Sequence, residues 1–122
     1  MNVTSSWRIV SSPDFDDDYL RMEMEPYVEL HQHRDRVSGT YHVGLQQGEI
    51  DGRIEGADRI VFSFEGMDEM EEVHGRGALQ IDGAQARFVL EYHQGDTFTF
   101  ICEQPTWRQT YLCGLLETGW SS

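Results

Sequence analysis

The sequence predicts an all-β fold, an up-and-down antiparallel β-barrel of about eight strands. Between residues 59 and 103, apolar and polar residues alternate almost without interruption, which places the apolar set on one face of each strand. Turn-forming pairs separate these runs, and no segment before residue 104 has a well-supported helical pattern. The inward set comprises Ile60, Phe62, Phe64, Val73, Gly75, Gly77, Leu79, Ile81, Ala86, Phe88, Leu90, Tyr92, Phe98, Phe100 and Cys102.

The earlier part of the chain continues this pattern. Residues 7–10 form a short first strand that ends at a Ser-Ser-Pro sequence. Leu20, Met22 and Met24 extend the apolar face, and Pro26 marks a bend in their strand.

Turn chemistry predicts the registers of four hairpins. Asp82-Gly83 and Gln47-Gly48 are two-residue turns, residues 34–37 form a longer turn, and residues 93–95 form a three-residue loop with a left-handed glycine. Each register brings inward residues opposite inward residues, as a single buried face requires. The predicted pairs include Leu30 with Tyr41, Leu45 with Ile50, Ile81 with Ala84 and Leu90 with Phe98.

Eight meandering strands with one apolar face are expected to close into a barrel, because closure removes the sheet edges. A two-layer antiparallel stack is the alternative. Inward Gly75 and Gly77 either leave room for Phe62 and Phe88 or mark a point of curvature. The barrel domain spans residues 1–103; in the tail, residues 104–122, a short helix or strand packs on the barrel, or the tail is a loose end.

The charge balance limits the classes of partner. The chain of 122 residues has a net charge of −13, from 22 acidic residues against nine arginines and no lysine. This excess disfavours nucleic acid and favours a basic partner, or it serves solubility alone. No apolar run approaches the length of a membrane span, and no secretory signal is apparent. We expect a cytoplasmic monomer or homodimer, in which two cysteines make no disulfide framework.

Alternate connections of a meander lie at the same end, so the predicted barrel is polarised. Arg34, Arg36 and Arg59 gather at one end, with Arg53 and Arg87 close by. The other end collects Asp14, Asp16, Asp17, Asp18, Glu49, Glu65, Asp68, Glu69, Glu71, Glu72, His93 and Asp96.

The carboxylate-rich end holds the best site candidate, around a polar insert at residues 65–72. Groups suited to acid–base chemistry meet there if the registers hold. The alternative is structural: Asp96 caps its own turn and Arg76 pairs with acids across strands, with His74 opposite Glu91. The candidate residues are Glu65, Asp68, Glu69, Arg76, His93 and Asp96.

Two further groups bear on metals and ligands. His31, His33 and His42 share the outer face of one hairpin, with His42 facing Glu29, but a solvated polar face is the preferred interpretation, and we predict no metal and no cofactor. The inward rings either fill the barrel or line a small cavity. These rings are Tyr41, Phe62, Phe64, Phe88, Tyr92, Phe98 and Phe100.

Three motifs resemble those of a set of small uncharacterised bacterial proteins: an aromatic-x-Gly-x-Asp-Glu segment at residues 64–69, Gly-Arg-Gly at 75–77 and His-x-Gly-Asp at 93–96. The resemblance covers roughly residues 7–103. The overall form is similar to calycins, the lipocalin and avidin type of barrel, without the lipocalin Gly-x-Trp signature. The resemblance implies a fold and no activity.

Three functional hypotheses follow. The first is a non-enzymatic binding protein, with a small apolar ligand in the barrel or a basic partner at the acidic end. The second is an enzyme that uses carboxylates and histidine at the barrel mouth, and the third is an interaction protein with a filled core. An internal cavity above a few hundred Å³ favours the first, strongly shifted carboxylate or histidine pKa values in a cleft favour the second, and a dry, filled interior with an exposed apolar patch favours the third.

Overall fold

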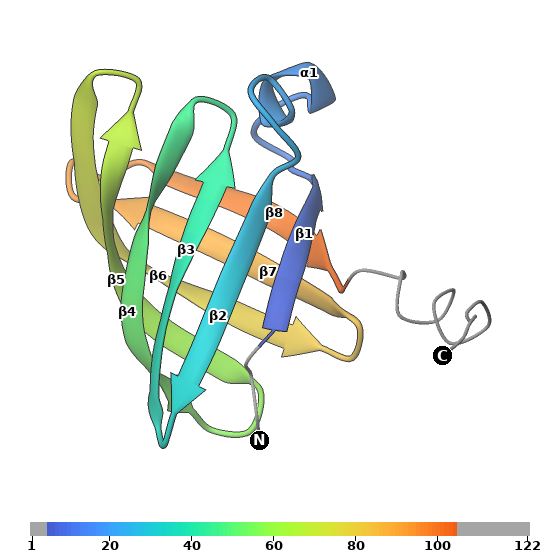
Figure 1. The fold of residues 1–122 in the computed structure, drawn as a ribbon, viewed down its shortest axis with the longest axis vertical. Helices are drawn as coiled ribbons and strands as arrows, with labels where there is room; N and C mark the ends of the chain where they lie inside the picture. Colours follow the sequence, from blue (N-terminus) through green and yellow to red (C-terminus); the bar gives the residue numbers. More distant parts are fainter. Residues whose placement is uncertain (1–4, 105–122) are drawn as a thin grey trace.

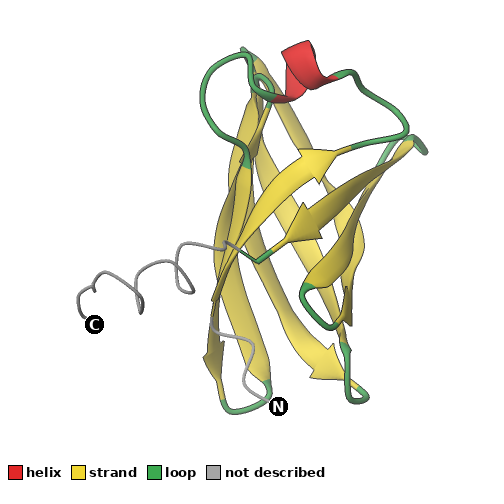
Figure 2. Ribbon diagram, turned by 90° about the vertical axis from the view of Figure 1, so that its right-hand side faces the viewer, coloured by secondary structure: helices red, strands yellow, loops and turns green. Residues whose placement is uncertain are grey.

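Eight antiparallel strands close into an up-and-down barrel, as predicted (Figure 1). The structure is a computed structural model that describes residues 5–104. One short helix, α1 (Asp17–Leu20), lies between the first two strands and sits over one end of the barrel (Figure 2). The strands are β1 (Ser5–Ser11), β2 (Tyr27–His33), β3 (Arg36–Val43), β4 (Gln46–Glu55), β5 (Arg59–Asp68), β6 (Glu71–Asp82), β7 (Gln85–Tyr92) and β8 (Thr97–Glu103). The expected packing of residues 105–122 lies outside the described residues and stays a prediction.

Large apolar side chains fill the middle of the barrel. Phe88 is fully buried at the centre, with ring centroids 5.6 Å from Phe62, 5.9 Å from Tyr41 and 6.1 Å from Phe100. Offset and tilted contacts of this kind add to the stabilisation from burial alone. The inward-facing assignment of the seven predicted rings is confirmed, although Phe98 is only partly buried.

The predicted faces are correct, but three of the four predicted registers are wrong. The β7–β8 register is confirmed, with Leu90 opposite Phe98 and Gly95 in a left-handed conformation at φ +111°. At the other hairpins the true pairs are Leu30 with Gly39, Gly39 with Ile50, and Ile81 with Ala86. These registers differ from the predicted ones by two, six and two residues respectively. Each shift is even, so no side chain changes face.

The prediction of a strand through Leu20, Met22 and Met24 is also wrong. Leu20 is buried at the end of α1, whereas Met22 and Met24 are 55% and 47% exposed. The side chain of Asp16 caps the helix by accepting a hydrogen bond of 2.9 Å from the backbone N–H of Tyr19. The alternation of apolar residues there was therefore accidental, and β2 begins only after Pro26.

Gly77 illustrates why glycines face inward. A Cβ atom at this position would lie 2.9 Å from the Phe62 ring and against the backbone oxygen of Val89. The first proposed role of Gly77, as room for Phe62, is thus supported. Close approach of backbone and ring is a standard use of glycine in a strand.

We expect Gly77→Ala to lower the free energy of unfolding by about 1–3 kcal/mol, because the added methyl group overpacks this contact. Urea unfolding followed by circular dichroism measures the change. Arg76→Ala is the control, because the Arg76 side chain lies on the outer face of the same strand and is 83% exposed. It should lower the free energy of unfolding by less than about 0.5 kcal/mol. Equal effects of the two substitutions would contradict the assignment.

The connections alternate between two ends, as predicted. Residues 12–26, 44–45, 69–70 and 93–96 lie at one end, which we call the mouth, and residues 34–35, 56–58 and 83–84 lie at the other. Among residues 5–104, no helix has the length and apolar character needed to cross a membrane.

The mouth is uneven because the β5–β6 hairpin is long. The predicted polar insert is strand and not loop: β5 runs to Asp68, β6 starts at Glu71, and the two pair throughout. β7 pairs with β6 only from Gly75 onward, so the first four residues of β6 project beyond β7. Where β6 and β7 separate, the His74 and His93 rings stack with centroids 4.7 Å apart.

Candidate functional site

The segment around α1 forms one wall of a pocket at the mouth. Phe15 stacks on Tyr19 with centroids 4.8 Å apart and reaches Phe98 at 4.9 Å and Phe100 at 5.8 Å. The helix is joined to the β3–β4 turn by a backbone hydrogen bond of 3.1 Å from Gly44 N–H to the Leu20 carbonyl. A side chain at Gly44, which has φ +59°, would collide with the Tyr19 ring. The turn therefore needs glycine for both conformation and space.

The pocket has a volume of about 250 Å³. It lies at the mouth of the barrel, and the large apolar side chains of the buried cluster fill the centre. An apolar cavity of about 150 Å³ accepts benzene, so this space suits a small molecule. The residues that line it are Phe15, Tyr19, Val43, Gln46, Asp68, Glu71, Val73, Tyr92, Gln94, Asp96, Phe98 and Phe100.

A buried polar relay lies beneath the pocket. Gln46 is only 3% exposed; its Nε2 donates to the Tyr41 hydroxyl at 2.6 Å, and its Oε1 accepts from the Tyr92 hydroxyl. Burial raises the pKa of Tyr41 to about 12, a shift that Asp68 reinforces and the Gln46 hydrogen bond opposes. Burial, reinforced by the nearby Tyr41, also raises the pKa of Tyr92. Both phenols therefore stay neutral at physiological pH and act as hydrogen-bonding groups.

Negative charge dominates the polar part of the pocket wall. Asp68 is half-buried at the inward-facing end of β5, and exposed Glu71 and Asp96 stand at the rim. No arginine, lysine or histidine is among the described residues that line the pocket. Burial raises the pKa of Tyr19, and the charge of nearby Asp68 adds to this shift.

The six predicted mouth residues do not converge on one site. Asp68 and Asp96 line the pocket, and Glu69 lies in the β5–β6 turn with φ +60°. Glu65 is exposed on the outer wall opposite His74. The outer wall also carries Arg76, whose Nε lies 3.5 Å from Glu91 Oε1, and His93 is exposed beside His74. The predicted pairing of His74 with Glu91 is therefore wrong, whereas the alternative of Arg76 in an ion pair across strands is confirmed.

The seven predicted cavity rings divide between pocket and core. Tyr92, Phe98 and Phe100 line the pocket. The other four, Tyr41, Phe62, Phe64 and Phe88, lie below it in the buried cluster.

The predicted histidine face is not a single group. His42 lies opposite Tyr27 and not Glu29, and it is 6% exposed because the β1–β2 connection covers it. Its Nε2 lies 3.0 Å from Glu23 Oε1. His31 and His33 are exposed on β2, opposite Ser38 and Arg36. Within residues 5–104, no three His, Cys, Asp or Glu residues are arranged to hold a metal ion.

Sequence reasoning missed half of the pocket. Phe15 and Tyr19 lie in a segment that was treated as loop and strand, although Asp16 before two further acids is a helix-start signal. Gln46 was placed in the connection around the predicted Gln47-Gly48 turn. In the observed register Gln46 faces the inside of the barrel, as do Gly48 and Ile50 on the same strand. A polar side chain at an inward position indicates a buried hydrogen-bond network. Neither the protein-family models nor the curated proteins that were searched contain a match to this sequence.

Proposed function

We propose that this protein is a non-enzymatic binding protein that takes a small ligand with an apolar body and a positively charged group into the mouth pocket. The observation that carries the proposal is the pairing of aromatic walls with carboxylates in a pocket without a cationic lining residue in the described chain. The pocket volume of about 250 Å³ limits the ligand to about one ring and a short substituent.

Each part of the pocket has a counterpart in such a ligand. Phe15, Phe98 and Phe100 offer apolar area, and the faces of aromatic rings also attract cations. Asp68 and Asp96 neutralise an ammonium group at the rim. Gln46 and Tyr92 at the base supply amide and hydroxyl groups that fix orientation, as a few polar groups do in apolar pockets.

Binding accounts for the geometry better than catalysis does. Arg76 and His93, two of the groups that acid–base chemistry would use, stand outside the described lining of this pocket. General acid–base catalysis requires such groups within hydrogen-bond reach of the substrate. A calycin-like kinship fits this proposal, since the eight-stranded closed barrel is compatible with one. We further propose that the protein is bacterial and is located in the cytoplasm.

Titration calorimetry with 2-phenylethylamine tests the proposal, with phenylacetate as the anion of similar shape. The amine should bind and phenylacetate should bind at least about tenfold more weakly, a difference of about 1.4 kcal/mol. Asp68→Asn with Asp96→Asn should weaken the amine about tenfold or more, because it removes the pocket charge.

The matched control is Asp35→Asn with Asp82→Asn, which changes the net charge equally at the opposite end of the barrel. It should leave amine binding within about twofold, because exposed charges that distant are screened. Equal losses in the two double variants, or preference for phenylacetate, would overturn the proposal.

A further inference from the structure

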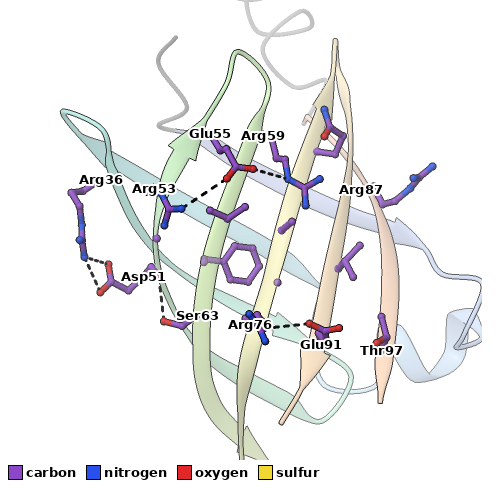
Figure 3. A pocket seen from close by; sticks show the side chains of 17 residues that line it. Arg36, Asp51, Arg53, Glu55, Arg59, Ser63, Arg76, Arg87, Glu91 and Thr97 are labelled. Carbon is purple, nitrogen blue, oxygen red and sulfur yellow. Dashed lines mark hydrogen bonds and ion pairs between the residues drawn. The ribbon is translucent and has the colours of Figure 1, made fainter. Parts of the chain in front are cut away.

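A second hollow lies on the outer wall of the barrel, away from the mouth pocket (Figure 3). It has a volume of about 870 Å³ and crosses the outer faces of β3 to β8. Five of the nine arginines of the chain line it, against three of its 22 carboxylates, Asp51, Glu55 and Glu91. We call this surface the arginine trough and define it by Arg36, Arg53, Arg59, Arg76 and Arg87 around Val61, Ala78 and Val89.

The strand registers arrange the trough in rows. Val61 pairs with Ala78 and Ala78 with Val89, which makes a half-buried floor of small apolar side chains across three strands. On one side of this floor, Arg59 of β5 and Arg87 of β7 both pair with Gln80 of β6, which lies between them. These three residues therefore form one row across the strands. The row on the other side is Asp51, Ser63, Arg76 and Glu91. The two flanking rows are four residues apart along each strand, about 14 Å, which leaves room for one extended chain.

The ion pairs in the trough are weak enough to exchange partners. Arg36 pairs with Asp51 at 3.0 Å, Arg59 with Glu55 at 3.5 Å and Arg76 with Glu91 at 3.5 Å, and these arginine side chains are 46–83% exposed. Exposed pairs of this kind contribute about 0–1 kcal/mol.

Two further arginines add charge to the trough. Arg53 makes a longer contact, with 3.9 Å between a guanidinium nitrogen and a carboxylate oxygen of Glu55, which is also the ion-pair partner of Arg59. Arg87 has no ion pair within residues 5–104. The trough thus presents spare guanidinium groups, which bind carboxylates in a planar, two-bonded geometry.

We propose that the arginine trough binds an acidic, extended segment of a partner protein. Acidic side chains of the segment meet the arginines of both rows, and small apolar side chains lie on the Val61–Ala78–Val89 floor. The local positive charge on a chain of net charge −13 is the complementary feature that selects this partner. The proposal is independent of the mouth pocket.

Two other occupants fit the trough less well. Nucleic acid binding relies on a dense cationic surface and on aromatic stacking, whereas this floor is Val61, Ala78 and Val89 and the whole chain is acidic. A second copy packed face to face would bring five arginines against five. Charge complementarity therefore favours an acidic polypeptide.

Fluorescence anisotropy with a labelled peptide of alternating Glu and Val, six residues long, tests the proposal at low and at physiological salt. We expect saturable binding that weakens with salt, and no binding of the matched, uncharged Gln–Val peptide. Arg59→Gln with Arg87→Gln should weaken binding at least about fivefold, roughly 1 kcal/mol. Ala78→Glu, which places a carboxylate on the floor, should weaken it further.

Arg8→Gln with Arg21→Gln is the control, since both arginines lie outside the trough and the net charge changes equally. It should alter binding by less than about twofold, because the lost charges are screened from the trough. Circular dichroism shows whether each variant folds. Equal losses in both double variants, tighter binding of an oligothymidylate, or arginine-dependent self-association in sedimentation would overturn the proposal.

Discussion

Replacing Gln46 with leucine is expected to lower the free energy of unfolding by about 2–5 kcal/mol, because two buried hydroxyl groups lose their partner at once. Gln46 Nε2 donates to the Tyr41 hydroxyl, and Gln46 Oε1 accepts from the Tyr92 hydroxyl. Leucine fills a similar volume, so the loss reports the hydrogen bonds and not a cavity. Urea unfolding measures it.

Gln47→Leu is the matched control, since Gln47 is the exposed next residue on the outer face of β4. It should change the free energy of unfolding by less than about 0.5 kcal/mol. Adding Tyr41→Phe and Tyr92→Phe to Gln46→Leu should recover part of the loss, since it removes the orphaned hydroxyl groups. A Gln46→Leu protein as stable as Gln47→Leu would show that the relay adds nothing to stability.

The protein should lose stability steeply between pH 10 and pH 12. Tyr41 and Tyr92 have pKa values raised above the ordinary value of 10.0, that of Tyr41 to about 12, chiefly because burial disfavours the phenolate. The unfolded chain therefore releases protons first as the pH rises, and the folded state loses its advantage. The contribution is complete below pH 10, and Tyr41 alone accounts for a loss of about 2 kcal/mol by pH 12.

Urea midpoints from pH 8 to pH 12, with tyrosinate absorbance at 295 nm, test this expectation. Burial also raises the pKa of the Cys102 thiol to about 12, so its contribution declines from pH 9 upward. Cys102→Ala isolates the tyrosines, and adding Tyr92→Phe to it should make the decline shallower. A free energy of unfolding that stays constant from pH 10 to pH 12 would contradict the burial of these phenols.

The alternation of the sequence predicted the faces of the strands but not their alignment. A period of two restricts the register to even shifts, and the turn must choose among them. At the β6–β7 hairpin, Gly83 takes φ +65° as the first and not the second turn residue. At the β3–β4 hairpin the left-handed residue is Gly44, three residues before the predicted Gln47. Its packing against Tyr19 is a tertiary contact that no local pattern reveals.

The site was predicted less well for a related reason. Topology correctly brought Asp68 and Asp96 to the same end, since that needs only the order of the strands. Whether a side chain faces the pocket or the outer wall depends on strand limits, and β5 and β6 extend through the residues that were read as an insert. Glu65 and Arg76 are therefore outer-wall residues. Phe15 reaches the pocket only because the segment leading into α1 folds over the mouth.

The first four residues of β6, which extend beyond the end of β7, bear on how the molecule avoids aggregation. A strand in a closed barrel has no free edge where it pairs with a neighbour on both sides. Residues 71–74 of β6, however, pair with β5 alone along most of their length. A bare backbone edge is a template for intermolecular strand addition. This short edge begins with Glu71 and Glu72, both exposed, and charged side chains at such an edge oppose its extension by another copy. The acidic mouth thus protects the one stretch of β6 that closure leaves uncovered, whatever ligand the pocket holds.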